Sequence, residues 1–120
     1  MNLNADFTKR VVVHAGDAPW IASPMPGVDR RMLDRIGDEV ARATSIVRYA
    51  PGSAFSAHTH TGGEEFLVLE GAVREGDDDL VSWSWLRLPD GVPLRAMAGP
   101  DGAKLWMKTG HLPFAQAPTV

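Results

Sequence analysis

Three side chains near the middle of the chain have the types and the spacing of a mononuclear metal site. His58 and His60 are two residues apart, and Glu64 follows after Thr61-Gly62-Gly63. Imidazole nitrogens combined with a carboxylate oxygen are suitable ligands for zinc, iron, nickel or manganese. The sequence therefore predicts one divalent metal ion held by His58, His60 and Glu64.

Two local elements must position these ligands. Side chains two residues apart point to the same side of a β-strand but cannot share a helix face, so His58 and His60 are expected on an extended segment. Thr61-Gly62-Gly63 is expected to form a tight turn, because glycine tolerates the backbone angles that turns require. Such a turn would bring Glu64 back toward the two imidazoles.

Two glycines frame the ligands at fixed distances. Five residues separate Gly52 from His58, one separates His58 from His60, three separate His60 from Glu64, and six separate Glu64 from Gly71. This spacing resembles the first motif of the cupin family, whose members fold as a small double-stranded β-helix around one metal. The resemblance implies an all-β, jelly-roll-like cupin barrel.

The wider sequence narrows this resemblance. From about Val11 to Lys108, the chain resembles the cupin domain of ChrR-type anti-sigma factors and their stand-alone relatives; the resemblance includes SIVRYAPGSAFSAHTHTGGEEFLVLEG and the upstream PMPGVDRRMLDRIGDEVARATS. Those anti-sigma factors carry a separate N-terminal zinc-binding domain that contacts the sigma factor. Because the chain has no cysteine and little sequence precedes the first expected strand, we expect a stand-alone relative that does not bind a sigma factor in that way.

The second motif of the family is only partly present. Cupins usually close the metal site with a third histidine, and the corresponding stretch is WSWLRLPDGVPL, from Trp83 to Leu94. The Pro89-x-Gly91 turn is kept, but Leu94 stands where the histidine should fall. At most two histidines and one carboxylate remain, a composition that non-haem iron oxygenases use with open coordination positions. A barrel that has lost its metal is the alternative, because an apolar side chain replaces a ligand.

The composition agrees with one soluble domain. The 120 residues are expected to form a single cupin domain over 1–120, with the barrel core at about 10–110 and an arm on either side. The net charge of −3 argues against a nucleic-acid partner, which needs a basic face. No apolar run long enough to span a membrane and no leader are visible, so we expect a cytoplasmic protein without a membrane partner.

Twelve glycines and nine prolines divide the chain into short segments, as in barrels and sandwiches. Turns are expected at Asp90-Gly91 and Asp101-Gly102, and a solvated loop at Glu75–Asp79. Residues 32–47 also fit an amphipathic helix, and periodicity alone leaves this open; the family resemblance favours strands. The expected strands are Arg10–His14, Arg31–Ile36, Ala41–Tyr49, Glu65–Leu69, Leu80–Leu88 and Lys104–Thr109.

Other residues carry weaker predictions. Glu65 should point away from Glu64 and lie at the surface, and His14 and His111 are expected at strand ends rather than at the metal. One arginine is a candidate for holding an anion inside the barrel, but alternation does not say which of Arg30, Arg31, Arg42 and Arg48 face inward. The side chains expected to line a pocket are Leu94, Trp106 and Tyr49.

Three functions from different classes follow. The first is a small ChrR-like cupin that binds one divalent metal and binds or senses a small molecule. The second is a non-haem metal-dependent dioxygenase acting on a small diketone-like substrate, although no general acid or base beyond Glu64 is evident. The third is a metal-free binding barrel. The resemblance also implies a homodimer, and fold alone does not choose among these functions.

Overall fold

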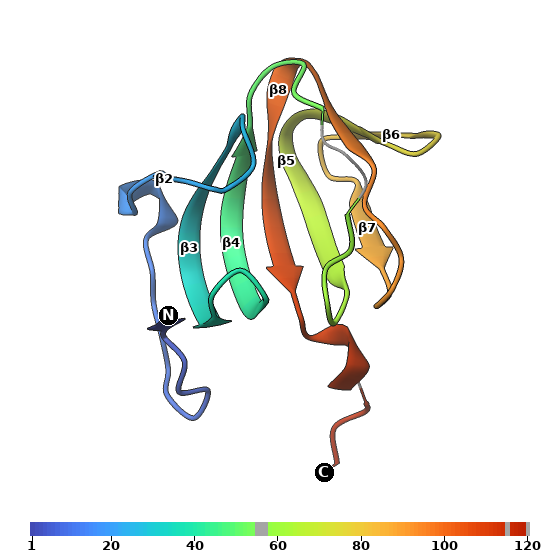
Figure 1. Cartoon of the computed structure of the whole chain (residues 1–120). Coiled ribbons are helices and arrows are strands. Elements are labelled where there is room, and N and C mark those ends of the chain that lie inside the picture. The colour runs from blue at the N-terminus through green and yellow to red at the C-terminus, as the bar shows by residue number, and fades with distance from the viewer. Residues whose placement is uncertain (55–57, 115, 120) are drawn as a thin grey trace.

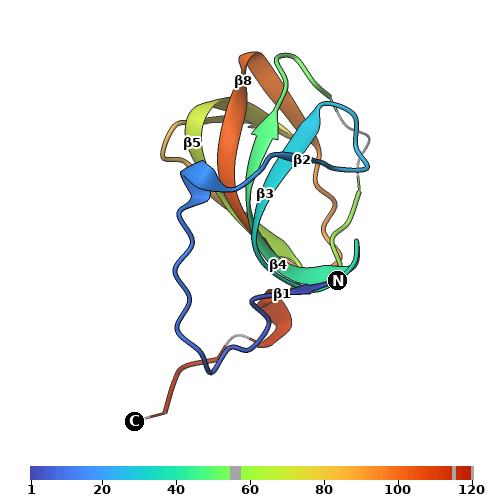
Figure 2. The same ribbon diagram turned by 90° about the vertical axis from the view of Figure 1, so that its left-hand side faces the viewer.

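The computed structural model describes residues 1–54, 58–114 and 116–119. It is nearly all-β, and the only helices in that part of the chain are two short 3-10 turns, η1 (Ala15–Asp17) and η2 (Leu112–Phe114). Figures 1 and 2 show one strongly curved sheet that wraps around an interior. The expected all-β fold is confirmed, and residues 32–47 form strands rather than the alternative helix.

Eight strands pair antiparallel in this sheet. The order across it is β1-β3-β4-β8-β5-β6, while β2 pairs with β3 and β7 pairs with β5. Because β8 lies between β4 and β5, the last strand of the chain connects the N-terminal strands to β5, on which Glu64 lies. The strands are β1 (Asn2–Leu3), β2 (Ile21–Ala22), β3 (Val28–Gly37), β4 (Ala41–Tyr49), β5 (Glu64–Glu75), β6 (Asp78–Val81), β7 (Trp85–Leu88) and β8 (Ala96–Thr109).

The register of β3, β4, β8 and β5 places their inner residues in rows across the sheet. The middle of the core is one such row, in which Val47, Leu105 and Val68 follow one another on neighbouring strands. Leu105 and Val68 are completely buried, as is Phe66 in the next row. A further row contains Arg35, Ala43, Thr109 and Glu64, and we call it the ligand row.

A β-bulge in β3 determines which of its side chains face the interior. The pairing with β4 shifts between Met32 and Asp34, so Leu33 is an extra residue without a partner in the ladder. An extra residue changes the alternation of side chains by one position. In a regular strand, Arg30 and Arg35 would point to opposite sides of the sheet. Because of the bulge, both line the interior.

Two of the expected strands are wrong in part or entirely. Arg10–His14 is not a strand: the apolar side chains of Val11–Val13 are exposed, and the outer edge of β3 is already paired with β1 and β2. Leu80–Leu88 is two strands, β6 and β7. A turn separates them at Trp83, whose φ of 71° is incompatible with an extended strand.

The turn predictions have mixed outcomes. Asp90-Gly91 does form a turn, in which the Val92 amide donates to the Pro89 carbonyl at 3.1 Å. Asp101-Gly102 does not end a strand but lies within β8, at an irregularity in its pairing with β5. Glu75–Asp79 is a tight hairpin between β5 and β6 rather than a loop. Among the described residues, no helix is long and apolar enough to cross a lipid bilayer.

Candidate metal and ligand site

A glycine turn brings Glu64 beside His60, as the sequence predicts. The Gly63 amide donates to the His60 carbonyl at 3.0 Å, and β5 begins at the next residue. Gly62 has a φ of 85°, and a Cβ atom there would lie only 2.6 Å from Cα of Gly110. Any larger residue would therefore push the turn away from the end of β8, and Glu64 would move with it.

The three predicted ligands lie together. Nε2 of His58 and Nε2 of His60 are 3.1 Å apart, and the two rings meet edge to face with centroids separated by 4.8 Å. Nε2 of His60 is also 3.1 Å from Oε2 of Glu64. Within residues 1–54, 58–114 and 116–119, however, no three or more histidine or carboxylate groups form a complete metal-binding cluster. The residues are in place, but their side chains do not surround a common point.

Glu64 has an unusual environment for a carboxylate. Its side chain is only 1 % exposed, and neither oxygen accepts a hydrogen bond from the described residues, although His60 Nε2 lies 3.1 Å from Oε2. Burial raises the pKa of Glu64 to about 7, with a further contribution from the negative charge of Glu75. A buried carboxylate without donors is costly, and a bound cation would compensate for it. This donor set therefore fits a divalent metal.

His60 is in the protonation state that metals require. Burial, together with the neighbouring His58, lowers the pKa of its imidazole to about 4. The ring is neutral at neutral pH, so a metal ion would not have to displace a proton from it.

Leu94 lies directly opposite His58. The Leu94 amide donates to the His58 carbonyl at 2.6 Å, and the His58 amide donates to the Leu94 carbonyl at 3.2 Å. The Leu94 side chain is 2 % exposed and packs beside His60 and Glu64. The residue at the expected position of a third histidine is therefore at this site, and it contributes apolar volume instead of a ligand.

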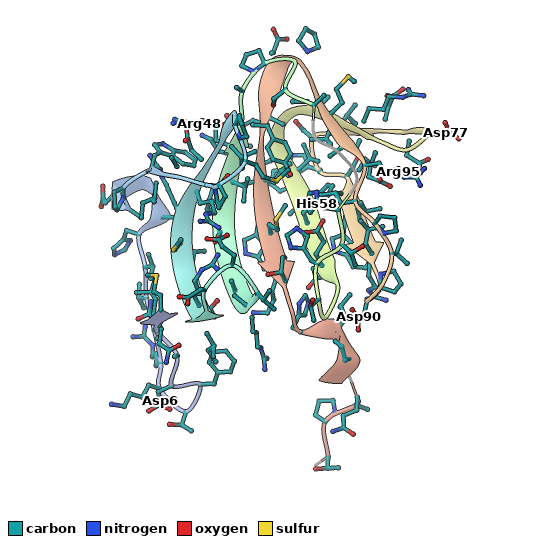
Figure 3. The ribbon with its side chains drawn as sticks, in the orientation of Figure 1. Asp6, Arg48, His58, Asp77, Asp90 and Arg95 are labelled. Carbon is teal, nitrogen blue, oxygen red and sulfur yellow. The ribbon has the colours of Figure 1, made fainter. Side chains whose placement is uncertain are left out.

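A cavity of about 260 Å³ adjoins the two histidines. Figure 3 shows His58 in front of the curved sheet, on the side of β8 and β5. Tyr49 and Leu94 line the cavity; burial, together with the charge of Glu64, raises the pKa of Tyr49 well above its usual value. Trp106 does not line it, contrary to expectation. It alternates with inward-facing Leu105 and Met107 along β8, and so it lies on the outer side.

Three other residues considered from the sequence, Glu65, His14 and His111, do not line this cavity. Glu65 points to the opposite side of β5 from Glu64, where it accepts a hydrogen bond from Trp85 Nε1 at 3.1 Å and lies 2.8 Å from His111 Nε2. Glu65 is therefore partly covered rather than a free surface carboxylate. His14 is exposed next to η1.

Sequence reasoning overlooked two charged residues that line the cavity, Arg35 and Glu39, and left Arg30 as one of four candidates. Arg30 donates through both terminal nitrogens to the Glu39 carboxylate, at 3.2 and 3.3 Å. Arg35 is 6 % exposed and donates through Nη1 to the Asp38 carbonyl. Side-chain alternation along β3 does not predict that Arg30 and Arg35 face the same side, because the extra residue Leu33 reverses the alternation between them.

Comparisons with known proteins give the fold family. A family model described as the ChrR cupin-like domain matches residues 8–113. No curated protein matches the sequence. Among solved structures, Rhodobacter sphaeroides SigE in complex with the anti-sigma ChrR matches with 22 % identity and a TM-score of 0.65, over 78 % of this chain and 50 % of that chain. The chain thus spans about half the length of that relative.

Two further structures share the fold. An RmlC-like cupin from Shewanella frigidimarina NCIMB 400 matches with 17 % identity and a TM-score of 0.66, over 84 % of this chain and 90 % of that chain. An acetylacetone dioxygenase from Acinetobacter johnsonii matches with 16 % identity and a TM-score of 0.64, over 84 % and 72 %. Identities this low establish the fold alone. The complex of ChrR with SigE gives no support to the expectation that sigma-factor binding is absent.

Proposed function

The chain belongs to the ChrR cupin-like family, and from this premise we propose that it binds one divalent metal ion at His58, His60 and Glu64 and binds or senses a small molecule in the adjacent cavity. The buried Glu64 carboxylate carries the proposal, because no described residue donates a hydrogen bond to either of its oxygens. A divalent cation would supply the missing positive charge.

Each residue around the ion would have its own role. His58 and His60 would contribute imidazole nitrogens and Glu64 a carboxylate oxygen, while Leu94 adds no ligand. A bound metal would act as a Lewis acid toward an oxygen atom of the small molecule. The cavity is smaller than the 300–1,000 Å³ common for drug-sized ligands, so its ligand has few atoms.

A second candidate function is a non-haem dioxygenase acting on a small diketone-like substrate. Two observations favour it: the composition of two histidines and one carboxylate, and the similarity of fold to the acetylacetone dioxygenase. The third candidate, a metal-free binding barrel, is favoured by Leu94 and by the incomplete clustering of the three ligands within the described residues.

Elemental analysis of the purified protein tests the metal proposal, with two adjacent glutamates as a matched pair. We expect about one metal ion per chain in the wild type and in Glu65→Gln, and loss of the metal in Glu64→Gln and in the His58→Ala/His60→Ala double variant. Zinc favours sensing, whereas iron, manganese or nickel favours the dioxygenase and justifies measuring oxygen uptake. No metal in any variant after supplementation would contradict the proposal and leave the metal-free barrel.

We also propose a homodimer that forms through the outer side of the sheet. Ile46, Trp106, Leu67 and Trp85 are in register across four neighbouring strands, and Trp85 is 51 % exposed. Aromatic residues are enriched in protein interfaces. Analytical ultracentrifugation should give the mass of two chains for the wild type and for Trp83→Lys, which lies outside this row, but one chain for Trp85→Lys. A monomeric wild type would rule the dimer out.

A further inference from the structure

The ligand row connects the predicted metal site to a buried arginine. Arg35 pairs with Ala43, Ala43 with Thr109, and Thr109 with Glu64, each on the next strand of the sheet. The two residues between the charged ends are small. Arg35, Ala43 and Thr109 all line the cavity that His58 also lines, so open space lies above the middle of the row.

Arg35 is a buried cation that forms no salt bridge with a described carboxylate, although Glu39 and Asp38 are near enough to attract its charge. It is 6 % exposed, its Nη1 donates to a backbone carbonyl of Asp38, and its Nε is buried without a hydrogen-bond partner among the described residues. The neighbouring Arg30 differs, because the Glu39 carboxylate binds both of its terminal nitrogens. Among the described residues that line this end of the cavity, two guanidinium groups, Arg30 and Arg35, thus share one carboxylate, Glu39, which binds Arg30.

The charge of Arg35 is costly to the folded protein in the absence of a counterion. Burial lowers the pKa of Arg35 and the positive charge of Arg30 lowers it further, while the negative charges of Glu39 and Asp38 offset only part of this effect. An unpaired buried charge destabilises a protein, whereas a carboxylate ligand can bind a guanidinium through two parallel hydrogen bonds. The metal site proposed above does not supply a counterion for Arg35, because Glu64 is at the opposite end of the ligand row.

We propose that the cavity selects a small organic acid, with its carboxylate at Arg35 and a carbonyl oxygen directed toward His58 and His60. The selection of a carboxylate rests on Arg35 alone, while the role of the carbonyl rests on the proposed function of the metal site. Three strand spacings of about 4.8 Å separate the backbones of Arg35 and Glu64, and both side chains occupy part of that distance. For a cavity of about 260 Å³, we propose a short oxo acid of roughly four or five carbons.

Two nearly isosteric probes test this selectivity. Acetoacetate and acetylacetone share the CH3–CO–CH2 unit, but acetoacetate has a carboxylate where acetylacetone has an acetyl group. Binding of each probe is measured by isothermal titration calorimetry to the metal-free protein and to the zinc-loaded protein, since zinc has no redox chemistry that would consume the probe. Zinc stoichiometry is measured separately in every variant.

Three arginine variants make the test specific. In Arg35→Met, we expect acetoacetate to bind at least tenfold more weakly while the affinity for acetylacetone stays within twofold of wild type. Arg35→Lys keeps the positive charge but lacks the planar guanidinium, so it should retain part of the affinity for acetoacetate. It also serves as a second test of position 35 if Arg35→Met folds poorly. Arg74→Met removes an exposed arginine that pairs with Asp79 and should change neither affinity.

The outcomes separate the two proposals. An Arg35-dependent affinity for acetoacetate, with or without zinc, supports the organic-acid inference. If zinc does not bind but this dependence is found in the metal-free protein, the metal proposal fails and the inference stands. Equal losses for both probes in Arg35→Met, no loss for acetoacetate, or no acetoacetate binding to the wild type in either form would overturn it.

Discussion

Leu94 and His58 exchange two backbone hydrogen bonds, so the side chain at position 94 stands beside the predicted metal ligands. An imidazole at this position would face the site, where the chain carries a leucine. We therefore expect the strength of metal binding to depend on this one side chain.

Leu94→His should increase the affinity for zinc at least about tenfold, because it adds a nitrogen ligand to two histidines and one carboxylate. Leu94→Met, which keeps the size and the apolar character, should leave the affinity nearly unchanged. Competition with a chromogenic chelator measures both. Equal zinc affinity in Leu94→His and Leu94→Met would show that position 94 does not reach the metal.

Zinc affinity should depend on pH through Glu64. The pKa of Glu64 is raised to about 7 and that of His60 is lowered to about 4, so between these values a metal ion displaces a proton from Glu64 but none from His60. We expect the apparent affinity to rise about tenfold per pH unit up to pH 7 and to level off above it. Titrations from pH 5.5 to 8.5 measure this profile, and a steep rise that continues above pH 8 would contradict it.

The same carboxylate should make the metal-free protein sensitive to pH. Because the folded-state pKa of about 7 exceeds the usual 4.5, Glu64 contributes its full stability below pH 4.5, and this contribution is lost as the pH rises through 7. Relative to Glu64→Gln, the wild type should therefore lose on the order of 3 kcal/mol between pH 4.5 and 8. Urea unfolding of both proteins measures this difference in stability. Both proteins contain His60, so the contribution of its titration is common to the two and cancels. A difference that does not change with pH would refute this prediction.

Trp83→Gly should stabilise the protein. Trp83 has a φ of 71° and is 74 % exposed, so its side chain contributes few contacts while its backbone is in the left-handed region. Glycine relieves that strain, but it also has greater entropy in the unfolded chain, which opposes the gain. The net effect should raise the free energy of unfolding by roughly 0.5–1 kcal/mol. Trp83→Ala keeps the strain and serves as the control. Thermal unfolding that shows no gain of Gly over Ala would contradict the strain argument.

The sequence by itself determined the local parts of this protein. The sequence predicted the bounds of β4, the turn before Glu64 and the proximity of His58, His60 and Glu64. These features depend on residue spacing, glycine positions and side-chain alternation within short segments. The place of Leu94 at the site could also be predicted, but only from the resemblance to cupins.

Only the tertiary structure decided which distant side chains share the cavity. Arg35 faces the interior because an extra residue in β3 shifts its pairing with β4, and Trp106 faces outward because of the register of β8. Val11–Val13 remains outside the sheet because other strands pair with the edge of β3. Strand register and edge pairing depend on the partner strand, so the pattern of one segment cannot specify them.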